Sequence, residues 1–264
     1  MRVESEERRV ELKEATEDIN MQNIYDNPAF FEGYSRLRER AVNANNLFEI
    51  PALMALLPQL AGKAVLDLGC GAGDKCAEYV RRGAARVVGI DISEKMLDLA
   101  RGQNADPRIE YRRLPMESLG ELEGPFDLAT SSLALQYVAD YAGVAAEVYR
   151  LLKPGGRFVF SQESPINTCF SGGERWTKDA DGNKLWANLS NYSVDGERES
   201  TWFVGGVKKY HRTFSTVVNT LVDAGFIVER LVEPVPDAAM VREYPDYADL
   251  LHKPDFLLVR ARKP

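Results

Sequence analysis

The stretch Val65–Asp74, VLDLGCGAGD, combines a buried strand with a glycine-rich turn. Three of its first four residues are apolar, which is typical of a strand covered on both faces in a parallel sheet. Gly69, Gly71 and Gly73 then alternate with other residues, and glycine allows positive φ and lets a ligand approach the backbone. A helical pattern begins after Asp74. This order predicts the nucleotide-site unit of a doubly wound α/β sheet.

The next apolar strand, 86–91, ends on Asp91 in the segment VVGID. A carboxylate there can accept hydrogen bonds from both hydroxyls of a ribose, because an ionised acid has acceptors and no donor. The dinucleotide-binding fingerprint would need a third glycine at position 74, where this chain has Asp74. An acid at a helix N-terminus repels a pyrophosphate. The pattern therefore favours a nucleoside ligand that carries a positive group.

The segments DLGCGAG and VVGIDIS resemble motif I and its follower in class I methyltransferases that use S-adenosylmethionine (SAM). FDLATSSLALQYV and LLKPGGRFVFS resemble the fourth strand and the turn into the fifth, so the resemblance covers residues 65–162. It implies a seven-stranded Rossmann-like sheet with an antiparallel last strand pair and SAM as cofactor. We expect a helical extension at 1–22 and a methyltransferase domain at 23–264 with a substrate cap at 163–212.

Cofactor contacts follow from this resemblance. The segment 25–38 resembles one that closes over SAM, where an aromatic ring covers the cofactor and an arginine meets its carboxylate. The residues 115–117 stand where the family reads the adenine. The predicted cofactor-binding residues are Tyr25, Tyr34, Arg38, Asp67, Gly69, Cys70, Gly71, Asp91, Ile92, Met96, Pro115, Met116, Glu117, Ser131 and Leu133.

Residues 164–210 depart from the strand–helix alternation. They are rich in turn residues and hold all three tryptophans of the chain. We interpret them as a cap over the reaction centre, although a surface hairpin with local tryptophan packing is the alternative for Trp176 and Trp186. The predicted substrate-binding residues are Gln136, Tyr137, Trp202, Tyr210 and Arg212, and the predicted catalytic residues are His211, Glu163 and Tyr25.

The chemistry leaves the acceptor open. Transfer from a sulfonium needs a base only when the nucleophile holds a proton of high pKa. The chain is similar to UbiE-like small-molecule methyltransferases, which often have histidine where it has Gln136 and Ser164. Its extension and cap are also similar to those of the terpenoid C-methyltransferase of teleocidin biosynthesis. An alkene acceptor needs no base but benefits from π faces. C-methylation of a secondary metabolite is therefore one hypothesis, and O- or N-methylation the alternative.

Two other classes of protein compete with a methyltransferase. A nicotinamide oxidoreductase is disfavoured by Asp74 and by the lack of a convincing Tyr-x-x-x-Lys pair. A non-catalytic SAM-binding protein is disfavoured by the intact glycine motif. The turn TSSL at 130–133 lacks the Asn/Asp-Pro-Pro-aromatic signature of amino-methylating DNA and protein enzymes.

Composition narrows the partners. The 264 residues carry a net charge of −7, which provides no overall basic surface for nucleic acid. We find no apolar run of the roughly 18 residues that a membrane span needs, and no apolar signal-peptide core. Three cysteines and two histidines form no disulfide or metal pattern. We therefore expect a cytoplasmic protein that acts on a small molecule.

The N-terminal residues 1–20 are charged and helix-prone. Leu12, Ala15 and Ile19 would form one narrow apolar stripe on such a helix. A lone helix of this length needs a supporting surface, which a second subunit could provide. We expect a homo-oligomer through this helix, and a frayed tail is the alternative.

Overall fold

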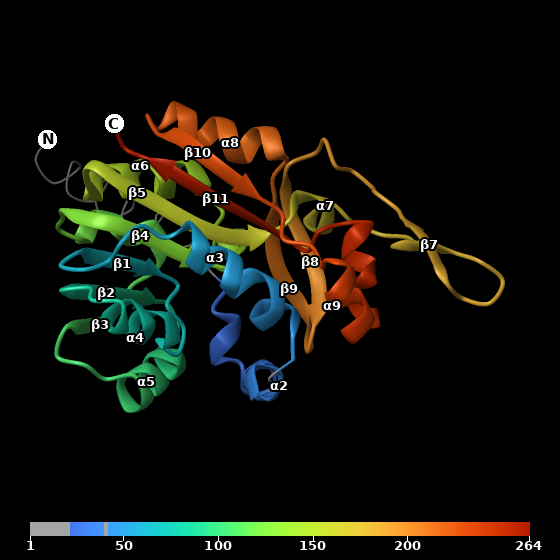
Figure 1. Cartoon of the computed structure of the whole chain (residues 1–264), viewed down its shortest axis with the longest axis horizontal. Coiled ribbons are helices and arrows are strands. Elements are labelled where there is room, and N and C mark those ends of the chain that lie inside the picture. The colour runs from blue at the N-terminus through green and yellow to red at the C-terminus, as the bar shows by residue number, and fades with distance from the viewer. Residues whose placement is uncertain (1–21, 40–41) are drawn as a thin grey trace, which may run out of the picture.

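The computed structural model describes residues 22–39 and 42–264 (Figure 1). The predicted N-terminal helix and its oligomer contact fall in residues 1–21, outside the described part. The side chains of Ser35, Arg38 and Glu39 also lie outside it. None of the described helices is long and apolar enough to cross a membrane.

A seven-stranded sheet in the order β10-β11-β5-β4-β1-β2-β3 forms the centre of the molecule. β11 is antiparallel to both β5 and β10, whereas all other neighbours pair in parallel. This is the predicted doubly wound methyltransferase sheet with an antiparallel last pair. The strands are β1 (Ala64–Leu68), β2 (Arg86–Asp91), β3 (Ile109–Arg113), β4 (Phe126–Ser132), β5 (Leu152–Glu163), β10 (Ile227–Val232) and β11 (Phe256–Arg262).

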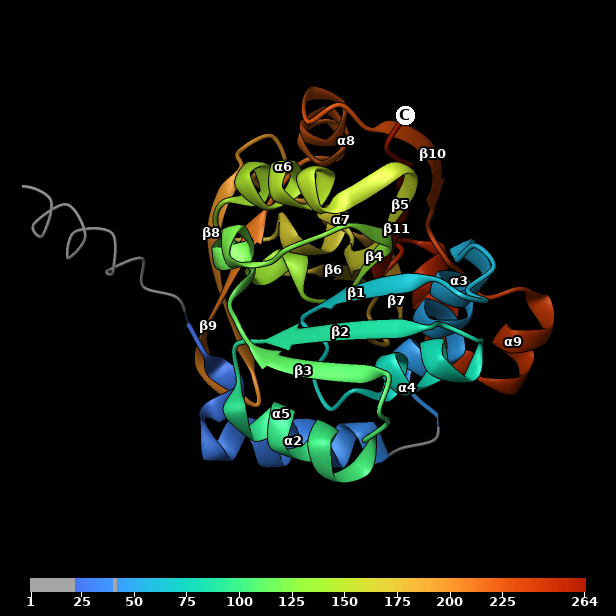
Figure 2. The same ribbon diagram turned by 90° about the vertical axis from the view of Figure 1, so that its left-hand side faces the viewer.

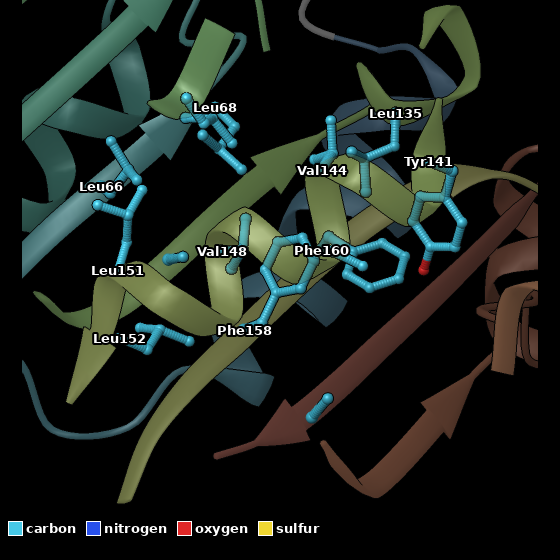
Figure 3. Close-up of a cluster of buried hydrophobic side chains, with 14 of the residues drawn as sticks. Leu66, Leu68, Leu135, Tyr141, Val144, Val148, Leu151, Leu152, Phe158 and Phe160 are labelled. Carbon is cyan, nitrogen blue, oxygen red and sulfur yellow. The ribbon is translucent and has the colours of Figure 1, made fainter. Parts of the chain in front are cut away.

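Successive side chains of each strand point to opposite faces of the sheet, so each face has its own hydrophobic core. Leu66 and Leu68 of β1 point to one face, where they join a cluster with α6 and α8 (Figure 3). Val65 points to the other face and packs with α3, α4 and α5. The helices are α3 (Ile50–Leu56), α4 (Asp74–Arg81), α5 (Glu94–Gln103), α6 (Tyr141–Leu151) and α8 (Phe214–Asp223), with the short turns η3 (Met116–Glu121) and η4 (Leu135–Tyr137).

The segment 45–56 does not form one continuous α-helix. A π-helical turn, η2 (Asn45–Glu49), precedes α3. Near the C-terminus, α9 (Ala238–Glu243) and η5 (Pro245–Leu251) form where the sequence analysis placed no element. Asp237 explains the start of α9, because its carboxylate accepts hydrogen bonds from the Ala239 and Met240 N–H groups.

The segment between β5 and α8 folds as a short helix and two hairpins. One hairpin, β6–β7, projects from the body of the molecule (Figure 1). The other, β8–β9, lies beside the sheet. These elements are α7 (Pro165–Thr168), β6 (Trp176–Lys178), β7 (Lys184–Ala187), β8 (Gly196–Trp202) and β9 (Val204–His211).

An N-terminal lid, residues 22–39, packs against the β8–β9 hairpin. It contains η1 (Ile24–Asp26) and α2 (Pro28–Glu39). In Figure 2 the start of the lid, in blue, lies beside β9, and α2 runs along the bottom of the view. The Gln22 side chain donates to the Gly206 carbonyl at 2.6 Å and accepts from the Lys208 N–H at 2.8 Å. Phe30 is fully buried against Trp202 and Phe203. The lid and hairpin therefore form one unit.

His211 joins the segment between β5 and α8 to the core at the end of β9. Its side chain is fully buried. The Nε2 atom lies 2.8 Å from the Tyr192 carbonyl and must donate to it, so Nδ1 accepts from the Thr168 hydroxyl at 2.8 Å. Burial lowers the pKa of His211 below its ordinary value. The neutral tautomer therefore holds this junction together.

The buried histidine predicts a pH-dependent stability. The pKa of His211 is lower in the folded protein than in the unfolded chain, so its stabilising contribution is complete above the unfolded-state pKa. The contribution decreases below that pH, because acid protonates the unfolded chain first. We expect the melting temperature to fall as the pH is lowered from about 7 to about 5, and we expect His211→Gln to flatten this pH dependence. Melting curves of the two proteins across pH test this. His252→Gln, at an exposed site, is the matched control and should keep the unmodified slope. An unchanged slope in His211→Gln would contradict the prediction.

Candidate active site

A cavity of about 300 Å³ lies beyond the carboxyl ends of β1, β2 and β4, where a doubly wound sheet binds its ligand. The lid and the β8–β9 hairpin also contribute to its wall. Most of the predicted site residues line it. They are Tyr25, Tyr34, Gly69, Gly71, Asp91, Ile92, Met96, Pro115, Met116, Glu117, Leu133, Gln136, Tyr137, Glu163 and Trp202.

The turn after β1 exposes its backbone to this cavity. Gly69 and Gly71 have φ values of 69° and 56°, in the left-handed region. A Cβ atom at Gly69 would lie 2.5 Å from the Ala134 Cβ, and one at Gly71 would lie 3.2 Å from the Met96 Cε. Only glycine therefore fits both the conformation and the space.

Asp91 lies at the end of β2 and is 9% exposed. Its Oδ2 accepts from the Gly71 N–H and its Oδ1 from the Ser93 N–H, both at 2.9 Å. Each oxygen keeps a further lone pair, which suits the two hydroxyls of a ribose. Burial raises the pKa of this carboxyl, although the backbone donors oppose the shift.

The lid is attached close to Asp91. The Ser93 hydroxyl donates to Asp26 Oδ1 at 2.5 Å, and Lys95 donates to the Asp26 carbonyl at 2.6 Å. Ser93 also caps α5 by accepting from the Met96 N–H. One serine thus connects the start of α5 with the lid that covers the cavity.

The side of the cavity near β3 is suited to a flat apolar ring. Ile92, Met96, Leu114 and Met116 supply apolar surface there. Glu117 is the polar group on this side, and burial raises its pKa. This arrangement fits an adenine that is stacked by aliphatic side chains and bonded at its polar edge.

Aromatic rings line the opposite side. Tyr25 contacts Tyr34 edge-on with centroids 5.1 Å apart, and Tyr34 contacts Trp202 at 6.2 Å. Burial raises the pKa of Tyr25 well above its usual range, so its phenol stays neutral. Tyr25 can therefore cover a ligand or donate a hydrogen bond, but it does not act as a base at neutral pH.

Glu163 and Gln136 bring polar groups to the aromatic side. Glu163 forms an ion pair with Lys209 of β9. The Lys209 ammonium also lies 5.4 Å from the centre of the Trp202 ring. Gln136 donates to the Leu133 carbonyl at 2.7 Å. Together these groups give the aromatic side a carboxylate whose charge is balanced by an ammonium group.

Three predicted cofactor residues lie beneath the glycine turn and do not line the cavity. Asp67 is buried and accepts from the Thr130 hydroxyl at 2.8 Å. The Ser131 hydroxyl donates to the Leu68 carbonyl at 2.9 Å. A Cβ atom at Gly89 would lie 3.0 Å from the Cys70 Sγ, so this thiol packs under the turn. These residues support the shape of the turn.

The structure does not place three of the predicted site residues, at the end of the cap segment, in the cavity wall. His211, Tyr210 and Arg212 do not line the cavity. Both ring nitrogens of His211 are occupied by structural partners, so it is not placed to act as a base on the acceptor. The Arg212 guanidinium donates to the Leu135, Val138 and Ala139 carbonyls and so fixes the turn η4. The three residues lie where the cap meets the core, but the buried His211 and Arg212 side chains bond to other protein groups, and Tyr210 is half-buried away from the cavity lining.

Sequence reasoning missed other lining residues. Lys75 was detectable, because it follows the glycine turn directly and places an ammonium near a site for a carboxylate-bearing ligand. Ser132 and Ala134 lie at or just beyond the end of β4 and were also detectable, whereas residues of the lid, the segment 43–45 and β11 reach the cavity only through the tertiary structure. Besides Lys75, the missed residues are Gln22, Ile24, Leu37, Asn43, Ala44, Asn45, Leu114, Ser132, Ala134, Val138 and Phe256. Arg38, predicted to meet a carboxylate, has a side chain outside the described residues.

The sheet, the glycine turn and Asp91 define an α/β protein that binds a nucleoside-containing ligand. A family model for a methyltransferase domain matches residues 66–160. A SAM-dependent methyltransferase of known structure from Mesorhizobium loti is 41% identical, with a TM-score of 0.74 over 84% of this chain and 98% of that one. A putative SAM-dependent methyltransferase from Listeria monocytogenes is 35% identical, with a TM-score of 0.74 over 81% and 96%.

Two further relatives match different shares of the chain. An uncharacterized protein of Haemophilus influenzae is 39% identical over 250 residues, which is 92% of this chain and 98% of that protein. A ubiquinone biosynthesis O-methyltransferase of Acinetobacter baylyi is 42% identical over 106 residues, but the match spans only 39% of this chain and 44% of that enzyme. The chain belongs to the class I SAM-dependent methyltransferases, and SAM is its cofactor.

Removing the Asp91 carboxylate should weaken SAM binding. The substitution Asp91→Ala deletes charge-assisted hydrogen bonds that contribute about 1.5–3 kcal/mol, so we expect the Kd to rise at least about tenfold. Titration calorimetry with SAM measures this. Asp98→Ala on the exposed face of α5 is the control and should leave the Kd unchanged. Unaltered affinity in a folded Asp91→Ala protein would show that Asp91 does not hold the ribose.

Proposed function

We propose that this methyltransferase acts on a small-molecule acceptor with an apolar or aromatic body. The observation that carries the proposal is the covered cavity. The lid and the β8–β9 hairpin meet above it and are held together by both hydrogen bonds of Gln22. A macromolecular acceptor would have to separate these elements. A small molecule needs only the space between the glycine turn and the aromatic side.

When bound, SAM supplies an electrophilic methyl group on a sulfonium. The residues of this chain orient the two partners and exclude water. Asp91 and the glycine turn suit the nucleoside end. The rings of Tyr25, Tyr34 and Trp202 form the wall where an acceptor would lie. Their π faces suit an acceptor that gains positive charge during transfer.

We also propose C-methylation as a finer possibility, with O- or N-methylation as its competitor. Support for a carbon nucleophile is the lack of an obvious base among the described lining residues. Glu163 is paired with Lys209, Tyr25 is neutral, and His211 lies elsewhere. Support for an oxygen nucleophile is the name of the ubiquinone O-methyltransferases that match part of the chain. The position of the methyl group in a purified product separates these possibilities.

Isotope transfer tests the size of the acceptor. The protein is incubated with SAM bearing a deuterated methyl group and with a cell extract divided by ultrafiltration. We expect label in compounds of the filtrate, detected by mass spectrometry. The same incubation with heat-denatured protein is the control for enzyme-dependent transfer. Label confined to retained protein or nucleic acid would overturn the proposal.

Glu163 provides a second test, because it lies on the acceptor side of the cavity. Glu163→Gln should reduce turnover of the acceptor at least about fivefold while the SAM Kd changes less than about twofold, since only acceptor contacts are lost. Glu197→Gln, which alters an exposed pair with Lys208 on the same hairpin, is the matched control. Loss of SAM binding in folded Glu163→Gln would place this carboxylate with the cofactor instead.

A further inference from the structure

Glu49 is a fully buried carboxylate that the cavity lining does not include. It ends the π-helical turn η2 and reaches the carboxyl ends of β4 and β5. Its Oε1 accepts from the Ser132 hydroxyl at 2.8 Å and from the Ser161 hydroxyl at 2.5 Å. Ser132 and Ser161 are register partners on adjacent strands, so both hydroxyls converge on one oxygen.

The other oxygen of Glu49 lacks compensation. Oε2 is buried and has no hydrogen-bond partner. Among the lysine, arginine and histidine side chains that the structure describes, which exclude that of Arg38, none forms an ion pair with this carboxylate. Burial of an unpaired charge is costly unless an opposite charge or further donors offset it. A cation bound near this carboxylate would supply the missing positive charge.

The position of Glu49 indicates which ligand that is. Ser132, which donates to Glu49, and Asn45, which begins the same π-helical turn, both line the cavity. The adjacent Leu133 lines it too, and its N–H donates to the Ser161 hydroxyl at 3.1 Å. Glu49 thus lies one layer behind the cavity wall. The cavity wall next to it is formed by the end of β4, at the ligand edge of the sheet.

The side chains that line the cavity include more carboxylates than ammonium groups, so their charge has the same negative sign as that of Glu49. The described carboxylates of the lining are Asp91, Glu117 and Glu163, whereas Lys75 is its ammonium group. Only Glu163 among these acids has an ion pair, with Lys209. A buried negative charge behind this wall increases the preference for a cation, because charges interact more strongly away from water.

We propose that Glu49 is the counter-charge for the sulfonium of SAM and makes the site favour SAM over its product S-adenosylhomocysteine. The two ligands share the adenosine, the ammonium and the carboxylate. They differ by the methyl group and the sulfonium charge. A fixed negative charge therefore attracts SAM and loses that attraction once the methyl group has left. This role concerns the cofactor and holds whichever acceptor the enzyme uses.

Glu49→Gln tests the proposal, because the amide keeps an acceptor for both serines and removes the charge. Calorimetry gives the Kd values of SAM, S-adenosylhomocysteine and sinefungin, whose amine supplies a positive charge near the transferred group. We expect the SAM and sinefungin affinities to fall at least about threefold more than that of S-adenosylhomocysteine. A purely structural role would weaken all three ligands alike.

Two further variants keep this test decisive. Ser161→Ala, at a residue that does not line the cavity, removes one hydrogen bond to Glu49 and retains the charge. The ratio of SAM to S-adenosylhomocysteine affinity should therefore stay within about twofold of the original. Glu49→Met replaces the carboxylate by an apolar chain of similar length and serves if the glutamine protein is unstable. It should show the same selective loss. Equal changes for charged and neutral ligands in either Glu49 variant, or no change, would overturn the proposal.

Discussion

The hydrogen bond from the Gly71 N–H to Asp91 Oδ2 connects the turn after β1 to the end of β2. A second bond, from the Cys70 N–H to the Ile90 carbonyl, reinforces this connection at 2.9 Å. The turn can follow this path only because Gly69 and Gly71 adopt left-handed conformations. The rest of the site is arranged around this fixed corner: the apolar slot beside β3, the lid above and the aromatic side opposite.

The cover of the site depends on segments far apart in the chain. Asp26 of the lid is held by Ser93 at the start of α5, and Gln22 is held by β9. Phe30 fills the space between the lid and the cap hairpin. These contacts hold Tyr34 of the lid beside Trp202 of β8. The two sides of the cavity are consequently joined through the lid.

Buried polar groups divide into those that shape the site and those that remain uncompensated. Asp67, Arg212 and His211 have partners that fix a turn or a junction. Asp91 is held by two backbone donors and still faces the cavity. Glu49 differs from both groups, because one of its oxygens has no partner while it lies behind the cavity wall. Other buried side-chain atoms also lack a partner, among them Gln136 Oε1 and Tyr79 Oη, but Glu49 is the carboxylate among them. A buried carboxylate is costly to leave without a compensating charge or donor.

The resemblance to class I methyltransferases implied the seven-stranded sheet and its antiparallel last pair. The sequence by itself determined the strand–turn–helix unit after position 64 and the place of the glycine turn and Asp91. These features are local: strands read as apolar runs, and a turn that needs positive φ needs glycine. The strand ends then identify the ligand edge of the sheet. For the same reason Gln136 and Glu163, which lie at or just beyond strand ends, were predicted at the cavity.

Only the tertiary structure decided which polar side chains reach the ligand. His211 lies next to the cap in sequence, yet its ring turns toward Thr168 and Tyr192. Glu49 gave no local signal, because an acid in a helical segment usually faces solvent. Its environment arises where η2 meets the ends of two strands distant in sequence. Side-chain direction and burial of charge depend on such long-range packing, and local patterns do not specify them.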